Sequence, residues 1–327
     1  MKALEKRYDL GFFPTPLHPL KNLSERYPEY EIFIKRDDQT GLASGGNKTR
    51  KLEYLIYEAL QNNCDIVITA GAQQSNHCRQ TAAACSVAGK ECHLLLGGEE
   101  PEDYNGNLLL SHLLGASLHF AGEHRKGEDI PVLKQDLEKE GKKVYVVPYG
   151  GSNLVGAMGY INAVKELKQQ IDDLKTEIDY IFFASSSGAT QAGIMVGMDL
   201  YGLNAELIPV NIDKAEIEGT TVEKIILDLI KQSEKFFSLK KKYTLKGIPL
   251  NRDYDAPGYG VITKGEKDAV KILASAEGIL LDPVYTGRAF FGMLDILEKR
   301  KLRPGSKILF WHTGGLPANY YYRKELK

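Results

Sequence analysis

The strongest constraint on the fold is a regular alternation of short apolar runs with longer helical patterns. The β-branched run at residues 65–71 precedes a helical pattern at 75–89, and the apolar run at 91–98 precedes another at 105–116. Further apolar runs occur at residues 31–38, 117–122, 143–151, 179–185, 205–212 and 307–315. Strands that alternate with helices form βαβ units, whose strands pair in parallel. The sequence therefore predicts an α/β fold with mostly parallel sheets.

Size and charge exclude several kinds of partner. The 327 residues suffice for two domains or one large α/β unit. The formal net charge is −1 with no long run of one sign, whereas nucleic-acid phosphates require a clustered basic surface. No apolar run approaches the length that spans a bilayer, and the N-terminal segment lacks the apolar core of a signal peptide. We therefore expect no nucleic-acid or membrane partner.

The four cysteines indicate a reducing compartment. Cys64, Cys78, Cys85 and Cys92 are too few for a disulfide scaffold. No CxxC pair occurs, so we do not expect a metal site. The cysteine pattern is that of a cytoplasmic protein with four thiols.

Three of the strand-like runs end in polar or glycine-rich turns: AGAQQSN at 70–76, ASSSGAT at 184–190 and HTGG at 312–315. In open α/β sheets, ligands bind outside the carboxyl ends of the strands. We therefore expect the three turns to line one cleft.

The turn at 184–190 favours a phosphate site. Hydroxyl groups and backbone N–H groups at the start of a helix bind anions, and three serines, a glycine and a threonine exceed what a simple N-cap requires. The Gly-Lys-Ser/Thr end of a P-loop is missing, and so is the GxGxxG dinucleotide fingerprint. These absences disfavour a nucleoside triphosphate and an NAD-dependent dehydrogenase.

Two further features join the phosphate turn. Ser75, Asn76 and His77 open an alanine-rich helix and suit a carboxylate, although simple capping, and a satisfied core or surface role for His77, are the alternatives. Lys48 follows Gly45 and Gly46 directly ahead of a helix, where it is either a solvated residue or a positioned amine. A lysine combined with a phosphate site is typical of enzymes that use pyridoxal phosphate (PLP).

The sequence resembles the PLP enzyme family that holds 1-aminocyclopropane-1-carboxylate deaminase and D-cysteine desulfhydrase, within the tryptophan-synthase-β-like group. The matching segments run in family order through nearly the whole chain: PTPL at 14–17, IKRDD at 34–38, GGNKTRKLE at 45–53, AGAQQSNHCRQTAA at 70–83, YGGSN at 149–153, SSSGATQAG at 185–193, APGYG at 256–260, LDPVYTGRAFFG at 281–292 and HTGG at 312–315. Together these segments are highly specific.

The resemblance implies a role for each matching position. Lys48 resembles the Schiff-base lysine, and Asn76 the residue that binds the PLP 3-hydroxyl. Ser75 and Tyr285 match substrate-facing catalytic residues, and core packing beside Pro283 is the alternative for the tyrosine. The implied phosphate cup consists of Ser186, Ser187, Gly188, Ala189 and Thr190. Thr313 matches the approach to the pyridine nitrogen, and His77 joins Ser75, Asn76 and Tyr285 in the implied substrate site.

The resemblance also implies an architecture. We expect two open, twisted, mostly parallel sheets flanked by helices. The smaller domain would consist of residues 50–160, inserted into a larger PLP-binding domain made of 1–49 and 161–327. PLP would lie between the domains, and the assembly would be a homodimer.

Two threonines bear on the reaction. Where the deaminase subgroup carries glutamate and leucine, this chain has Thr286 and Thr313. A carboxylate near the pyridine nitrogen would strengthen the electron sink more than a hydroxyl does, and opening a cyclopropane demands a stronger sink than β-elimination. The resemblance therefore implies a lyase that converts D-cysteine to pyruvate, ammonia and sulfide. The alternatives are an L-cysteate sulfo-lyase, a 1-aminocyclopropane-1-carboxylate deaminase and a non-catalytic protein that binds PLP and an amino acid.

A sulfonate substrate would require a cation in the pocket, because an anion buried without a partner is costly. Arg79, Arg288 and, more weakly, His77 are the candidates. The alternative interpretation makes Arg79 a salt-bridged helix residue and Arg288 a surface charge. Nothing in the sequence forces a cation into the pocket, so we expect a thiol leaving group.

Overall fold

Two sheets organise the protein in the computed structural model, which describes residues 4–214, 216–217 and 219–327. The five-stranded sheet has the order β1-β2-β9-β7-β8 and the four-stranded sheet the order β5-β4-β3-β6. The strands of the first are β1 (Leu17–Pro19), β2 (Glu31–Arg36), β7 (Tyr180–Ser185), β8 (Glu206–Asn211) and β9 (Lys307–His312); those of the second are β3 (Ile66–Ala72), β4 (Glu91–Gly97), β5 (Ser117–Phe120) and β6 (Val144–Val146).

Most strand pairs are parallel, which confirms the predicted fold class. Strand β1 pairs with β2 in the antiparallel direction, whereas the other named strand pairs of both sheets are parallel. The short antiparallel strand β1 was not among the predicted strands. Three residues are too few to show a period-two pattern, so local sequence carries no signal for this strand.

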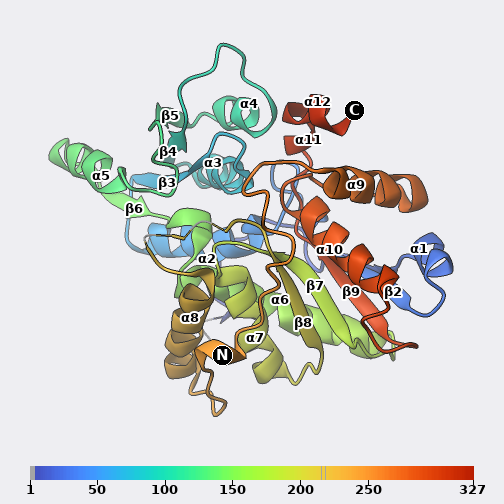
Figure 1. Cartoon of the computed structure of the whole chain (residues 1–327). Helices are drawn as coiled ribbons and strands as arrows, with labels where there is room; N and C mark the ends of the chain where they lie inside the picture. The colour runs from blue at the N-terminus through green and yellow to red at the C-terminus, as the bar shows by residue number, and fades with distance from the viewer. Residues whose placement is uncertain (1–3, 215, 218) are drawn as a thin grey trace.

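Helices cover both sheets (Figure 1). They are α1 (Lys21–Arg26), α2 (Lys48–Gln61), α3 (Asn76–Ala88), α4 (Gly106–Leu113), α5 (Ile130–Lys139), α6 (Leu154–Asp173), α7 (Ala189–Tyr201), α8 (Val222–Phe237), α9 (Lys264–Glu277), α10 (Thr286–Glu298), α11 (Ala318–Tyr321) and α12 (Arg323–Leu326). Short 3-10 turns occur at η2 (Asp37–Gln39), η3 (Tyr149–Gly151) and η4 (Leu245–Gly247). Helix α2 packs against α3 and α6, so it connects the helices of the two sheets.

The proposed domain boundaries at residues 50 and 160 fall inside α2 and α6. Residues 1–3, 215 and 218 of the proposed larger domain lie outside the described residues. The four-stranded sheet uses only residues 66–146, and the five-stranded sheet uses residues on either side of that range. The division into two domains therefore stays a prediction that the sheet composition supports.

A buried ionic network fixes the start of α2. Arg50 donates to Asp37 Oδ1 at 2.8 Å and to Glu166 Oε2 at 2.9 Å. Asp37 also accepts from Tyr160 at 2.7 Å and from Trp311 at 2.8 Å. Although burial opposes ionisation, Arg50 lowers the pKa of Asp37 to about 2. The charged pair therefore anchors the start of α2 to the turn that follows β2, and the helix presents its first residues to the strand ends.

The predicted thiols are confirmed, since all four cysteines are buried and free. Among the helices in the described part of the chain, none combines the length and hydrophobicity that a membrane crossing requires.

Candidate active site

The three predicted turns line one open pocket, whose volume is about 690 Å³ including its solvent-filled mouth. Its wall includes the residues that follow β3, β7 and β9, so the carboxyl ends of strands from both sheets meet there. Of the sequence-predicted site residues, those in the wall are Lys48, Ser75, Asn76, His77, Ser186, Ser187, Gly188, Thr190, Tyr285 and Thr313. The expectation that the turns line a common cleft is confirmed.

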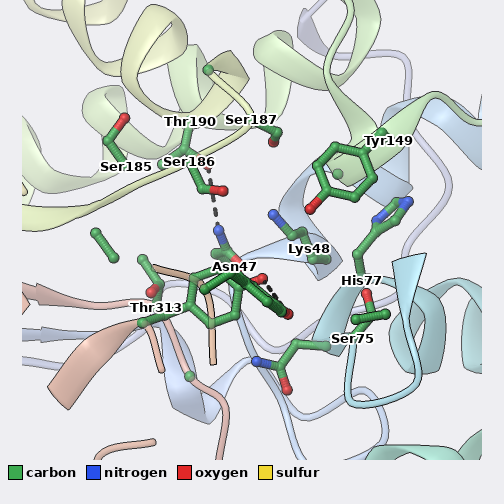
Figure 2. A pocket seen from close by; sticks show the side chains of 18 residues that line it. Asn47, Lys48, Ser75, His77, Tyr149, Ser185, Ser186, Ser187, Thr190 and Thr313 are labelled. Carbon is green, nitrogen blue, oxygen red and sulfur yellow. Dashed lines mark hydrogen bonds between the residues drawn. The ribbon is translucent and has the colours of Figure 1, made fainter. Parts of the chain in front are cut away.

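Lys48 is the first residue of α2 and lies in the middle of the pocket (Figure 2). Figure 2 shows its amine between the Ser186–Ser187 turn and the side that carries Ser75 and His77. The backbone holds the preceding residue, because the N–H of Asn47 donates to the carbonyl of Thr313 at 2.9 Å. Desolvation by the surrounding protein lowers the pKa of Lys48 to about 8. About a tenth of this amine is thus neutral, and therefore nucleophilic, at pH 7, far more than for an ordinary lysine.

The serine-rich turn leads directly into α7, as the sequence predicted. Gly188 precedes the helix with φ of 96°, a left-handed conformation that favours glycine. The first-turn amides of a helix have no intrahelical acceptor and attract anions. The N–H of Ala189 donates to Ser152 Oγ at 3.1 Å, and Ala189 is not among the residues that line the pocket. The turn has the chemistry of a phosphate site.

Two asparagines are oriented for binding at the pocket. Asn47 Nδ2 donates to Thr190 Oγ1 at 3.3 Å, which joins the lysine loop to the phosphate turn (Figure 2). Asn76 Oδ1 accepts from Asn107 Nδ2 at 2.9 Å. Since its oxygen is engaged, Asn76 can offer the N–H groups of its amide to a ligand.

The start of α3 is a capped helix N-terminus. Ser75 is the N-cap, and its Oγ accepts from the N–H of Cys78 at 3.2 Å. Ser75 therefore caps α3, as the alternative interpretation holds. The Ser75 hydroxyl proton, which capping does not use, and the first-turn amides can still serve a carboxylate.

His77 has a fixed tautomer. Its Nε2 lies 2.8 Å from Thr69 Oγ1, and that hydroxyl donates its only proton to the carbonyl of Val147 at 2.8 Å. Nε2 must therefore carry the ring proton, which leaves Nδ1 as an acceptor. Burial, then the charges of Lys48 and Lys51, hold the pKa of His77 well below its usual value. The imidazole offers the pocket no positive charge.

Tyr285 belongs to a tyrosine cluster. Its hydroxyl donates to that of Tyr259 at 3.0 Å, and Tyr149 also lines the pocket. Burial raises the pKa of Tyr285 well above its usual value. Asp282 accepts from the N–H of Tyr285 at 2.9 Å and so holds the tyrosine at the N-cap of α10. The packing alternative for Tyr285 does not describe this position, because the residue forms part of the pocket wall.

The two threonines have different surroundings. Thr313 lines the pocket, whereas Thr286 is buried and is not among the lining residues. The hydroxyl of Thr286 donates to Asp282 Oδ1 at 2.7 Å. The argument that placed both threonines near the pyridine nitrogen is therefore wrong for Thr286, because this hydroxyl is committed to the helix cap.

Neither arginine singled out from the sequence reaches the pocket. Arg79 donates to the carbonyls of Ala43 at 2.6 Å and Gly45 at 2.9 Å, and no carboxylate among the described residues pairs with it. Arg288 is fully buried and forms an ion pair with Glu266 at 2.8 Å. The salt-bridge interpretation of Arg79 and the surface interpretation of Arg288 are both wrong.

Sequence reasoning missed further residues around the pocket. Tyr149, Ser152 and Tyr259 lie in the motifs YGGSN and APGYG, so motif position was an available signal. Arg125 lies in no motif, yet its guanidinium is 4.6 Å above the Tyr259 ring and pairs with Asp213 at 2.7 Å. Only the folded arrangement brings this arginine to the pocket rim.

Comparison with known proteins places these features in a family. Residues 8–314 match the family described as pyridoxal-phosphate dependent enzyme. The chain belongs to this family. It is 41% identical to D-cysteine desulfhydrase of Klebsiella pneumoniae strain 342 and 40% identical to that of Salmonella paratyphi A, with 98% of this chain and 97% of each relative covered. The crystal structure of an ACC deaminase homologue has a TM-score of 0.89 at 35% identity and covers 99% of this chain and 97% of that one. The predicted resemblance, fold and cofactor are confirmed.

A glycine in the pocket wall supports the fit of pyridoxal phosphate independently of the comparisons. A Cβ at Gly150 would lie 2.2 Å from Ser187 Oγ and 3.9 Å from Lys48 Nζ. The glycine therefore keeps space open between the amine and the serine-rich turn. An amine that can bind an aldehyde and an anion site that can bind a phosphate thus lie against the same gap.

Proposed function

We propose that this PLP-dependent enzyme is a D-cysteine desulfhydrase, which converts D-cysteine and water to pyruvate, ammonia and hydrogen sulfide. The observation that carries the proposal is the identity of about 40% with curated D-cysteine desulfhydrases along nearly the whole of both chains. The pocket chemistry supports a lyase over a sensor, because it combines an amine of lowered pKa with a carboxylate site and an anion site.

We propose that the phosphate turn and Lys48 hold the cofactor. Ser186, Ser187, Gly188 and Thr190 would bind the phosphate through hydroxyl and backbone N–H groups, and Ala189 would support the turn through Ser152. Asn76 would donate to the 3-hydroxyl, and Thr313 would face the pyridine nitrogen. When bound, pyridoxal phosphate supplies the electron sink that makes the Cα–H bond of an amino acid acidic.

The remaining roles belong to side chains around the substrate. The N-terminus of α3, with Ser75 and Asn76, would bind the substrate carboxylate. Lys48 Nζ, with its lowered pKa, would take the Cα proton as a general base. Tyr285, with its raised pKa, would keep its hydroxyl proton. Its hydroxyl, which donates to Tyr259 in the structure, would turn to donate toward the departing β-substituent. The pocket wall that encloses these groups limits the access of bulk water.

The charge of the pocket favours a thiol over a sulfonate. Among the described residues that line the pocket there is no arginine, and His77 is neutral with Nε2 engaged by Thr69. Arg125 at the rim is already paired with Asp213. A sulfonate would therefore lie beside an unprotonated imidazole nitrogen with no matching guanidinium, whereas a thiol needs no cation.

A substrate panel tests the proposal. The substrates would be D-cysteine, L-cysteine, L-cysteate, β-chloro-D-alanine and 1-aminocyclopropane-1-carboxylate. For each substrate we would measure the sulfur product, which is sulfide or sulfite, and the keto acid, which is pyruvate or 2-oxobutyrate. We expect D-cysteine and β-chloro-D-alanine to give the highest kcat/KM, with one pyruvate per sulfide for D-cysteine. Equal or faster turnover of L-cysteate or of the cyclopropane compound would overturn the assignment, and so would tight amino-acid binding without product.

We also propose that the enzyme is a cytoplasmic homodimer with the cofactor between two domains. The free cysteines and the family resemblance support this proposal. Light scattering after gel filtration should give twice the chain mass of 36.4 kDa. A monomeric mass at micromolar concentration would contradict it.

A further inference from the structure

The loop that precedes Lys48 is conformationally unusual. Four consecutive residues have positive φ: Ala43 at 41°, Ser44 at 70°, Gly45 at 67° and Gly46 at 129°. Glycine adopts such angles readily, but alanine and serine do so only at an energetic cost. A conformation of this kind persists only where surrounding contacts hold it. The contacts that hold this loop therefore fix where α2 and its lysine begin.

Arg79 contacts one side of the loop. It is fully buried, and its Nη1 and Nη2 donate to the carbonyls of Ala43 at 2.6 Å and Gly45 at 2.9 Å. Its Nε has no partner among the described residues. Burial lowers the pKa of Arg79 to about 9. A buried guanidinium that lacks a carboxylate is unfavourable by itself, so its gain lies in the two charge-assisted hydrogen bonds to the loop.

Gln80, the next residue of α3, holds the other side. Its Oε1 accepts from the N–H of Thr49 at 2.8 Å and from the Thr49 hydroxyl at 2.9 Å. A Cβ at Gly46 would lie 2.4 Å from Gln80 Nε2, so the amide also packs closely on the loop. Arg79 and Gln80 thus contact the backbone before and after Lys48.

The same helix carries the proposed carboxylate site. Helix α3 starts at Asn76 directly after its N-cap Ser75, and Arg79 lies one turn further along. A rigid helix that binds the substrate carboxylate at its first turn and the lysine loop at its second sets the distance between the two. We propose that Arg79, supported by Gln80, is a positioning residue that aligns the Lys48 amine with the cofactor and substrate sites. This inference rests on the proposed role of Lys48.

Covalent capture of the cofactor tests the inference without turnover. Apo-protein would be mixed with pyridoxal phosphate and reduced with borohydride at intervals, and the labelled lysines would be identified by peptide mass spectrometry. Wild type should be labelled at Lys48. For Arg79→Met we expect the rate of labelling at Lys48 to fall about 100-fold and label to appear at other lysines, because a displaced amine loses the benefit of orientation. Arg79→Lys keeps a cation but not the paired geometry, so its labelling rate at Lys48 should lie between those of wild type and Arg79→Met.

Matched variants separate positioning from loss of stability. Leu273→Ala removes a fully buried side chain of α9 in the core of the larger sheet, and it should lower the melting temperature yet keep the wild-type labelling rate and site. Gln80→Leu removes the acceptor for Thr49 and should slow labelling even if Arg79→Met does not fold. The inference would be overturned if folded Arg79→Lys and Gln80→Leu were both labelled at Lys48 at rates within twofold of the wild-type rate.

The outcome can be distinguished from failure of the proposed function. Wild-type labelling at Lys48 without sulfide release from D-cysteine would reject the substrate and leave the positioning role intact. Wild-type labelling at a different lysine would reject the positioning role together with the role of Lys48.

Discussion

Lys48 is an amine that the fold keeps partly unprotonated, and this makes its reactivity depend on pH. Desolvation lowers its pKa from 10.5 to about 8. Between these values the unfolded chain holds a proton that the folded chain has released. Lys48 therefore destabilises the folded state most below pH 8, and this destabilisation shrinks as the pH rises to 10.5.

The rate of cofactor capture by apo-protein should follow the neutral amine. We expect it to rise about tenfold per pH unit up to pH 8 and then level off. Nα-acetyl-lysine in the same buffers corrects for the ionisation of the cofactor, and its own rate should keep rising to about pH 10. A protein rate that still climbs steeply between pH 9 and 10 would contradict the desolvated amine.

His77 should remain neutral across the physiological range. Burial and the nearby lysines hold its pKa well below 6.5, and Thr69 engages its Nε2 proton. Nitrogen NMR of labelled histidine should therefore report the Nε2-protonated neutral ring from pH 8 down to pH 6. His124, which is exposed and beside Asp129, has a raised pKa and should gain its proton first. Protonation of His77 at or above pH 6.5 would restore a cation to the pocket and weaken the case against a sulfonate.

At the scale of elements, the turn η3 keeps the gap between the lysine and the phosphate turn. Gly150 has φ of 65°, and a side chain there would collide with Ser187. Gly150→Ala should therefore weaken pyridoxal phosphate binding to apo-protein by about tenfold or more, measured by fluorescence titration. Gly202→Ala is the matched control, since Gly202 has φ of 66° with no atom within 4 Å of the added carbon. Equal affinities for the two variants would contradict the proposed effect of the collision with Ser187.

Sequence patterns predicted the elements that carry the site because those patterns are local. The helical pattern at 75–89 and the apolar run at 179–185 agree with α3 and β7 within two residues. The role of Arg79 could not be predicted, because it depends on two loop carbonyls more than 30 positions earlier. Thr286 was misplaced for a similar reason: its neighbour in the motif faces the pocket, but the cap formed by Asp282 turns its own hydroxyl inward.

At the scale of the whole molecule, the pocket exists because strand ends from both sheets meet around the start of α2. The buried network of Arg50 and Asp37 holds that helix, while Arg79 of α3 holds the preceding loop. Residues that are distant in sequence thereby converge on one amine. We propose that this amine performs the elimination of sulfide from D-cysteine.

Sulfide release from D-cysteine by wild type and Lys48→Ala tests that claim most directly. We expect wild type to release sulfide and pyruvate in equal amounts, and Lys48→Ala to lose about 1,000-fold or more in rate, because covalent attachment and proton transfer are lost together. Lys224→Ala, which removes an exposed lysine paired with Asp228 on α8, should match wild type. Circular dichroism should show that both variants are folded. Sulfide release by folded Lys48→Ala within tenfold of wild type would contradict the account.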